Sequence, residues 1–132
     1  MTDRDTEAVV SARAFAIEVA RLLHDRHCED VLLLDVQGLS QVCNFVLISS
    51  GTSDRQMKAL AHELRDLGDE QGHPCFRSSA DSDSTWIVVD FVDLVTHLFE
   101  PSLRTYYDLE GLWSDARRVP WARDGDGDDG RA

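Results

Sequence analysis

Residues 51–53 (Gly-Thr-Ser) and two acidic residues, Asp90 and Asp93, have the side-chain types that phosphate chemistry requires. The small residues follow an apolar run and precede a helical pattern, and a helix N-terminus binds phosphate groups through its free N–H groups. Two carboxylates can hold Mg²⁺, so these residues together would suit a metal-dependent nucleotidyltransferase. The spacing argues against it, because acids an odd number of positions apart lie on opposite faces of a strand unless a turn intervenes. The chain also has a single lysine, Lys58, so we keep this enzyme as an alternative and favour turn or rim positions for both acids.

Other patterns that resemble metal or nucleophile sites are incomplete. Residues 62–66 (HELRD) begin like a zinc-protease helix but have aspartate where the second histidine belongs. Residues 124–129 (DGDGDD) begin like a calcium-binding loop, yet an aspartate occupies its glycine position and the chain ends before the last ligand. Ser53 lacks the second glycine of a nucleophile elbow and suits a helix cap instead. We therefore expect no catalytic residues, no metal site and no cofactor, and a protein that is not an enzyme.

Net charge limits the class of partner. The 13 Lys and Arg against 25 Asp and Glu give a net charge of −12, which opposes the attraction on which nucleic-acid binding depends. A basic protein is a better partner than DNA or RNA, although acidity also serves solubility. The apolar runs are too short to span a bilayer, and the N-terminus lacks the apolar segment of a secretory signal. We expect a cytoplasmic protein, not bound to a membrane, whose three cysteines are reduced thiols.

The elements that position these residues follow from the hydrophobic periodicity. Apolar spacing predicts a helix over residues 8–26, strands over 31–36 and 44–50, and a second helix that opens with a capping box at Ser53 and Gln56. Beyond it we expect a short strand at 75–77, a mobile polar loop at 78–84, strands at 85–91 and 92–99, and a short helix at 101–107. This order indicates an α/β sandwich: a mixed sheet of about five strands with helices mainly on one face. The 132 residues divide into a flexible N-terminus (1–7), one domain (8–115) and an acidic, disordered tail (116–132).

Helices that cover one face leave the other face of the sheet without a cover. That face would carry Trp86, Phe91 or His97, with little inside a chain of 132 residues to bury them. An exposed apolar patch of this kind usually marks a protein interface, and a second copy of the chain would satisfy it equally well.

Five ordered segments carry a resemblance to a known family. The chain from about Ala14 to Trp113 resembles the ribosomal silencing factor (RsfS, Iojap) family through residues 35–40 (DVQGLS), 51–60 (GTSDRQMKAL), 86–91 (WIVVDF), 95–99 (VTHLF) and 106–113 (YYDLEGLW). The resemblance implies a homodimeric α/β protein with a nucleotidyltransferase-like sheet that lacks catalytic acids. It also implies a partner, the basic large-subunit ribosomal protein fourteen. By covering the surface of that protein that meets the small subunit, members of the family block subunit joining and lower translation when nutrients are limiting.

The sequence departs from the family pattern at two places. The family usually has Glu-Gly where this chain has Ser79 and Ala80, so a charged partner contact is missing there. A family glycine is replaced by Val92, which removes the residue type best suited to a positive φ. We expect the segment from 78 to 84 to be the least transferable part of the resemblance.

These observations combine into one hypothesis about the partner contact. The apolar side chains of Trp86, Phe91, Val95, His97 and Phe99 would contact the ribosomal protein, and Asp90 and Asp93 would face its Lys or Arg side chains. Strand alternation cannot place all of them on one face, so some must serve the core or the dimer. The mechanism would be steric exclusion, and the alternatives are a large-subunit assembly factor or a nucleotidyltransferase.

Overall fold

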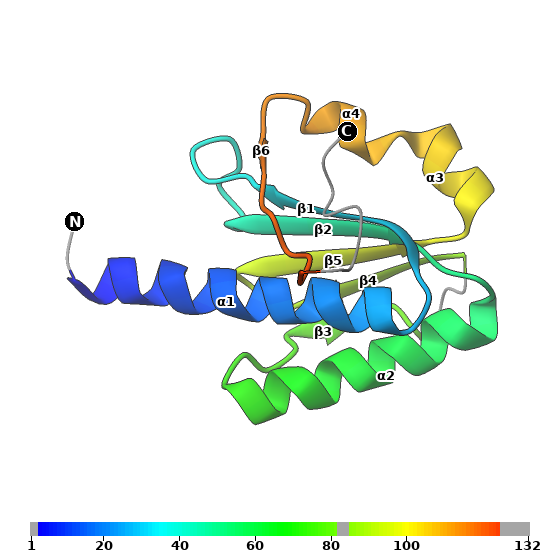
Figure 1. Cartoon of the computed structure of the whole chain (residues 1–132), viewed down its shortest axis with the longest axis horizontal. Helices are drawn as coiled ribbons and strands as arrows, with labels where there is room; N and C mark the ends of the chain where they lie inside the picture. Colours follow the sequence, from blue (N-terminus) through cyan, green and yellow to red (C-terminus); the bar gives the residue numbers. More distant parts are fainter. Residues whose placement is uncertain (1–2, 82–84, 125–132) are drawn as a thin grey trace.

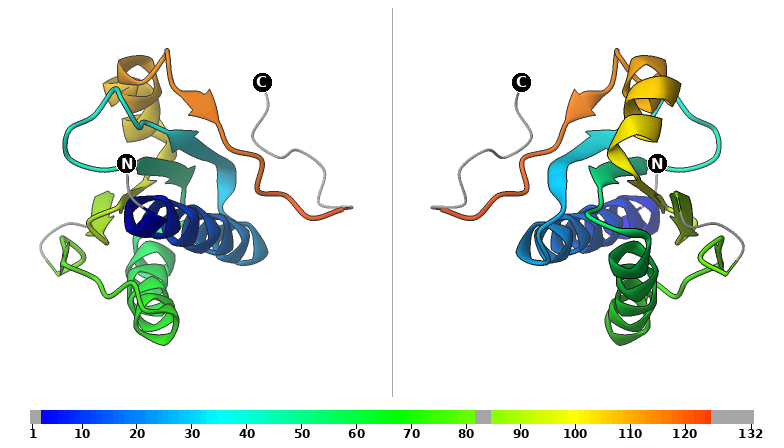
Figure 2. Two further views of the ribbon diagram at one scale, coloured as in Figure 1. Left: turned by 90° about the vertical axis from the view of Figure 1, so that its left-hand side faces the viewer. Right: turned by 90° about the vertical axis from the view of Figure 1, so that its right-hand side faces the viewer.

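The protein is built in three layers around one mixed sheet. The computed structural model describes residues 3–81 and 85–124. Two long helices, α1 (Asp3–Asp25) and α2 (Asp54–Gln71), lie on one face of the sheet, and two short helices, α3 (Pro101–Tyr107) and α4 (Leu109–Leu112), lie on the other (Figures 1 and 2). The predicted α/β sandwich is confirmed, with most of the helical cover on one face.

The sheet has six strands rather than about five. In chain order they are β1 (Glu29–Asp35), β2 (Phe45–Ser50), β3 (Arg77–Ser78), β4 (Trp86–Asp90), β5 (Leu94–Phe99) and β6 (Arg117–Arg118). Their order across the sheet is β3-β4-β5-β2-β1-β6, with β2 and β5 parallel at the centre and the other neighbours antiparallel. The additional strand is β6, whose two arginines pair with the end of β1. Its exposed side chains follow no apolar alternation, so the sequence pattern did not reveal it.

Helix α2 begins where its sequence predicts. The Ser53 hydroxyl accepts a hydrogen bond from the Gln56 backbone N–H at 3.1 Å, and the Gln56 side-chain carbonyl accepts one from the Thr52 N–H at 2.7 Å. The Ser53 bond is the one that the capping box predicts, whereas the Gln56 side chain binds the N–H one residue before the N-cap. Gly72 ends the helix with a φ of 77°, a conformation in which glycine avoids a Cβ clash.

Two apolar clusters separate the layers. The larger cluster lies between the sheet and α1 and α2, and it includes the helix residues Phe15, Val19 and Leu64. The smaller one lies under α3 and α4, where Leu103, Leu109 and Trp113 pack on side chains of β1 and β2. Because side chains alternate along a strand, the four longer strands β1, β2, β4 and β5 contribute to both clusters.

The predicted boundary of the domain at residue 115 is wrong. Val119 is buried and its N–H donates to the Leu33 carbonyl at 2.8 Å, while the buried Trp121 indole donates to the Val31 carbonyl at 3.2 Å. Arg123 pairs with Asp25 of α1 through two hydrogen bonds. We call residues 116–124 the C-terminal strap, because this segment crosses the β1 edge and joins it to α1. The rest of the predicted tail, residues 125–132, lies outside the described residues.

The N-terminal helix also extends further than predicted. It begins at Asp3 rather than near Ala8, so most of the segment predicted to be flexible is helical.

In the part of the chain that the structure describes, none of the helices combines the length and the apolar character needed to cross a membrane.

Candidate partner-binding face

The residues suited to nucleotide chemistry lie at opposite ends of the sheet. Residues 51–53 follow the end of β2, whereas Asp93 precedes the start of β5, and these two strands are parallel and in register. The strands alone separate the two ends by roughly 17 Å at ~3.3 Å per residue. Two of the N–H groups at the start of α2 are already bound within the capping box. These residues therefore do not form one phosphate and magnesium site, and within residues 3–81 and 85–124 no cluster of three His, Cys, Asp or Glu side chains could hold a metal ion.

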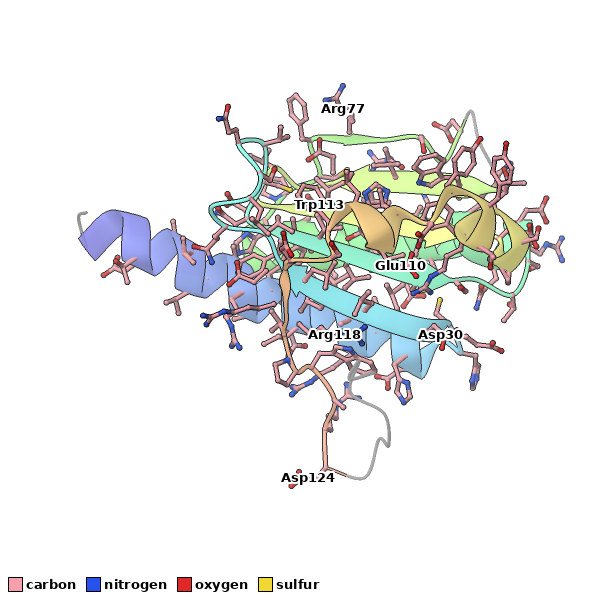
Figure 3. The ribbon with its side chains drawn as sticks, turned by 90° about the horizontal axis from the view of Figure 1, so that it is seen from above. Asp30, Arg77, Glu110, Trp113, Arg118 and Asp124 are labelled. Carbon is pink, nitrogen blue, oxygen red and sulfur yellow. The ribbon has the colours of Figure 1, made fainter. Side chains whose placement is uncertain are left out.

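The second side of β4 and β5 is only partly covered. Trp86, Val88 and Asp90 of β4 and Val95 and His97 of β5 are all partly exposed and alternate with buried residues. We call this set the β4–β5 face. It lies on the side of the sheet that carries α3 and α4, and Figure 3 looks onto that side, with Arg77 and Arg118 toward opposite edges. The short helices cover β1 and β2 more fully than they cover this half of the sheet.

Trp86 is the largest side chain of the β4–β5 face. Its ring stacks on Phe99 with centroids 4.8 Å apart and lies 5.0 Å from the ring of Tyr107 on α3. Its indole N–H donates to Nδ1 of His97 at 3.1 Å. Trp86 is thus held on three sides while part of its surface remains exposed, which is the arrangement that favours an interface anchor.

His97 is a neutral acceptor within this face. Burial lowers the pKa of His97 to about 4, because the protonated imidazolium would lose its hydration. Since Nδ1 accepts the indole hydrogen bond, the neutral ring carries its proton on Nε2. The residue that sequence analysis placed in the contact is therefore uncharged at physiological pH.

The two acids lie at the β4–β5 hairpin and support its turn. One carboxylate oxygen of Asp90 accepts a hydrogen bond from the Val92 N–H at 2.8 Å, and the other lies 3.7 Å from Nε of Arg77. Asp93 accepts a hydrogen bond from the Asn44 side chain at 3.4 Å and remains partly exposed. Both acids occupy turn and rim positions. Because both carboxylate oxygens of Asp90 already face a partner, Asp93 is the acid better able to meet a cationic partner.

Two residues predicted to contact a partner are buried instead. Phe91 lies on the opposite side of the sheet, where its ring packs edge-on against Phe15 of α1 with centroids 5.0 Å apart. Phe99 is on the correct side but is fully buried beneath Trp86. The prediction that Phe91 and Phe99 offer surface to a partner is wrong, because odd and even positions of β4 point to different layers and because α3 covers the end of β5.

The segment that departs from the family pattern packs against β4. Ser79 donates through its N–H to the Val88 carbonyl at 3.0 Å, and its hydroxyl accepts from the Val88 N–H at 2.8 Å. Ala80 is buried in the larger cluster. Ser79 and Ala80 of the predicted mobile loop are therefore packed, and residues 82–84 lie outside the described part. Ser79 also lines a shallow depression beside the β4–β5 face together with Arg77, Ser78, Val88 and Asp90.

Sequence reasoning missed two residues of this surface. Val88 lies between Trp86 and Asp90 on the same side of β4, and the period-two alternation of the strand would have found it. Tyr107 reaches Trp86 from α3, and no local pattern predicts a contact between residues 21 positions apart in the chain.

The fold and the site together define a class: a small α/β protein with a partly open sheet face and no catalytic or metal constellation among its described residues. The family model "Ribosomal silencing factor during starvation" (RsfS) matches residues 9–131. The RsfS proteins of Bacillus subtilis and Halalkalibacterium halodurans are 41% and 39% identical over 92 and 95 residues, which cover 70% and 72% of this chain and 78% and 81% of those proteins. The chain belongs to the ribosomal silencing factor family, whose members are named as regulatory proteins rather than enzymes.

Solved structures and more distant relatives agree with this assignment. A crystal structure of a protein from Chromobacterium violaceum is 30% identical with a TM-score of 0.71, covering 87% of this chain and 92% of that one. A crystal structure from Bacillus halodurans is 34% identical with a TM-score of 0.65, covering 80% and 93%. A mouse protein named "Mitochondrial assembly of ribosomal large subunit protein 1" is 29% identical over 96 residues, which span 70% of this chain and 42% of that protein.

Proposed function

We propose that this protein binds the large ribosomal subunit through large-subunit ribosomal protein fourteen and blocks association with the small subunit, repressing translation under nutrient limitation. Membership of the silencing-factor family supports the ribosome as the target. The observation that carries the contact is the β4–β5 face, an apolar strip that lies partly open in a strongly acidic chain. We further propose that the protein acts in the cytoplasm, without binding DNA directly.

The chemistry of the face favours a cationic protein surface. Trp86, Val88 and Val95 provide an apolar centre whose burial supplies affinity. Asp93 lies at its rim, and the net charge of −12 attracts a basic protein from a distance. Rim charges mainly accelerate encounter and fix orientation. The affinity would therefore come from the apolar centre, and the acids would speed formation of the complex.

Silencing of this kind needs no bond chemistry. A protein that occupies a shared surface excludes a competitor by mass action alone. At about 100 times its Kd it disfavours the competing partner by about 2.7 kcal/mol, or about a hundredfold.

A second candidate function is assembly of the large subunit. The printed name of the mouse relative supports it, since that protein is named for assembly of the ribosomal large subunit. An assembly factor would bind precursor particles in preference to mature subunits, whereas a silencing factor binds mature subunits. Parallel binding measurements with both particles distinguish the two functions.

We also propose that the free protein is a homodimer. Large apolar side chains remain exposed on α3 and α4, including Tyr106 at 78% and Leu112 at 70% of their full exposure. A second copy would cover surface of this kind. Sedimentation velocity of the purified chain tests the proposal, and a single monomeric species at micromolar concentration contradicts it.

Two pairs of variants test the large-subunit contact. Val88→Arg puts a cation in the centre of the β4–β5 face, and Val10→Arg puts one on α1, on the other side of the sheet, where Val10 is 61% exposed. Asp93→Lys reverses a rim charge, and Asp69→Lys makes the same change in net charge on α2. Co-sedimentation with purified large subunits is the measurement.

We expect the two face variants to bind about tenfold more weakly or worse, because each leaves a cation unpaired against a basic surface. The two control variants should bind like the unmodified chain. Equal binding by all four variants would mean that another surface makes the contact. The absence of any binding by the unmodified chain would contradict the proposed function itself.

A further inference from the structure

His97 makes a specific contact with the residue that dominates the β4–β5 face. In the antiparallel pairing of β4 and β5, Val88 lies opposite His97 and Trp86 lies opposite Phe99, so Trp86 and His97 are diagonal neighbours on the same side. At this spacing an aromatic side chain reaches across to its neighbour. The indole N–H points to Nδ1 of His97 at 3.1 Å, and the ring centroids are 6.1 Å apart.

The indole also contacts two aromatic rings. Phe99 supports one side of the ring by stacking, with an interplanar angle of 26°, and Tyr107 approaches at 40°. Ring contacts of this kind set the plane of the indole, and the alternative orientation in that plane is reached by a half turn about the Cβ–Cγ bond. The hydrogen bond to His97 adds a directional contact that favours one orientation, because a half turn would carry Nε1 away from Nδ1.

We propose that His97 is a positioning residue: its imidazole holds the Trp86 indole in one orientation before a partner binds, so that the contact surface is preformed. This inference rests on the proposed function, because it assumes that Trp86 contacts the large subunit. It assigns to His97 a role different from direct contact with the partner. Because burial lowers the pKa of His97 to about 4, the ring is neutral in the physiological range and Nδ1 can accept the bond.

Preforming the contact changes affinity by a predictable amount. Immobilising one large side chain on binding typically weakens an interaction by about two- to tenfold. A chain in which Trp86 is not held would bind its partner more weakly by that factor, through slower formation of the correct complex and faster release. We therefore expect an effect in this range when the acceptor is removed.

Three variants in the full chain separate positioning from simple packing. His97→Leu removes the acceptor and keeps an apolar side chain of moderate size, whereas His97→Asn places a carbonyl oxygen close to the position of Nδ1. Trp86→Phe removes the donor. The Kd for purified large subunits is measured for each variant and for the Trp86→Phe, His97→Leu double variant, with thermal unfolding followed in parallel.

The positioning role predicts that His97→Leu raises the Kd by about two- to tenfold and that His97→Asn recovers most of the loss. In the Trp86→Phe background, His97→Leu should have no further effect on the Kd. The indole N–H resonance of Trp86, assigned by its loss in Trp86→Phe, should shift in His97→Leu and return toward its original position in His97→Asn. A purely structural histidine would change unfolding without this pattern in binding.

The outcomes distinguish this inference from the proposed function. If the unmodified chain binds large subunits but His97→Leu binds equally well, or loses the same factor in the Trp86→Phe background, His97 does not act through Trp86 and the inference is overturned. If the unmodified chain does not bind large subunits, the proposed function fails and the inference fails with it.

Discussion

Replacing Val92 by glycine should stabilise the protein. Val92 occupies the turn between β4 and β5 with a φ of 75°, where a β-branched residue is strongly disfavoured. The turn is tight: the Asp93 N–H donates to the Phe91 carbonyl at 3.0 Å, and the Phe91 N–H donates to the Leu94 carbonyl at 2.8 Å. The carboxylate of Asp90 binds the Val92 N–H and helps to hold this conformation. The strained backbone is therefore retained although the glycine typical of the family is absent.

The expected gain follows from three contributions. A β-branched residue at this φ costs about 2–3 kcal/mol, the upper part of the range for strained backbone positions. Glycine removes this strain energy, but it also makes the unfolded chain more flexible, which opposes folding by about 0.4–1 kcal/mol. Val92 is 55% exposed, so losing its side chain removes only about 0.5 kcal/mol of burial. The net stabilisation is about 1 kcal/mol, or a rise in Tm of about 3–5 °C for a domain of this size.

Urea and thermal unfolding of Val92→Gly measure this gain, and Val92→Ala is the matched control. Alanine also lacks the valine side chain but still places a Cβ at positive φ, so its stability should stay within about 0.5 kcal/mol of the unmodified protein. If glycine and alanine shift Tm equally, or if glycine lowers it, the backbone at Val92 does not carry the strain assigned to it.

Three further predictions concern the core, the C-terminal strap and His97. Phe91→Ala should lower the free energy of unfolding by about 3–5 kcal/mol in urea titrations, because Phe91 lies in the core against Phe15, and a loss below about 1 kcal/mol would contradict that placement. Trp121→Ala should cost a similar ~3–5 kcal/mol by removing a buried ring and its hydrogen bond to Val31, and unchanged stability would mean that the strap does not contribute to the fold. His97 has a pKa near 6.5 when unfolded and about 4 when folded, so the unfolded chain binds the extra proton between these values and stability falls by up to about 3 kcal/mol as the pH drops through that window. The free energy of unfolding is measured against pH for this protein and for His97→Asn, so that the shared effect of the carboxylates cancels. If the two pH profiles are parallel, His97 does not cause the loss of stability.

Local sequence patterns predict most of the fold because they reflect burial. The stripe that includes Phe15 and Val19 defined α1, and the capping box defined the start of α2. The C-terminal strap was missed because it depends on two separated anchors, Val119 and Trp121, whose binding sites are on β1. Tertiary contacts of this kind leave no periodic signal in a short segment, and an acidic sequence beyond them resembles a disordered tail.

The candidate site was predictable in part. Alternation along β4 is enough to group Trp86 with Asp90 and to separate both from Phe91. Family resemblance identified the segments but carried no information on which side chains the short helices cover, so Phe99 was assigned to the surface although α3 and Trp86 bury it. The role of His97 as an acceptor for Trp86 depends on a cross-strand register that sequence alone does not provide.

The most direct test of the account is reassociation of separated ribosomal subunits, followed by light scattering, as the protein is added at increasing concentration. We expect that the protein sediments with large subunits, that reassociation falls as this binding saturates, and that Val88→Arg shifts both effects together to about tenfold higher concentration or beyond while Val10→Arg shifts neither. Full reassociation with the protein bound to every large subunit would contradict it.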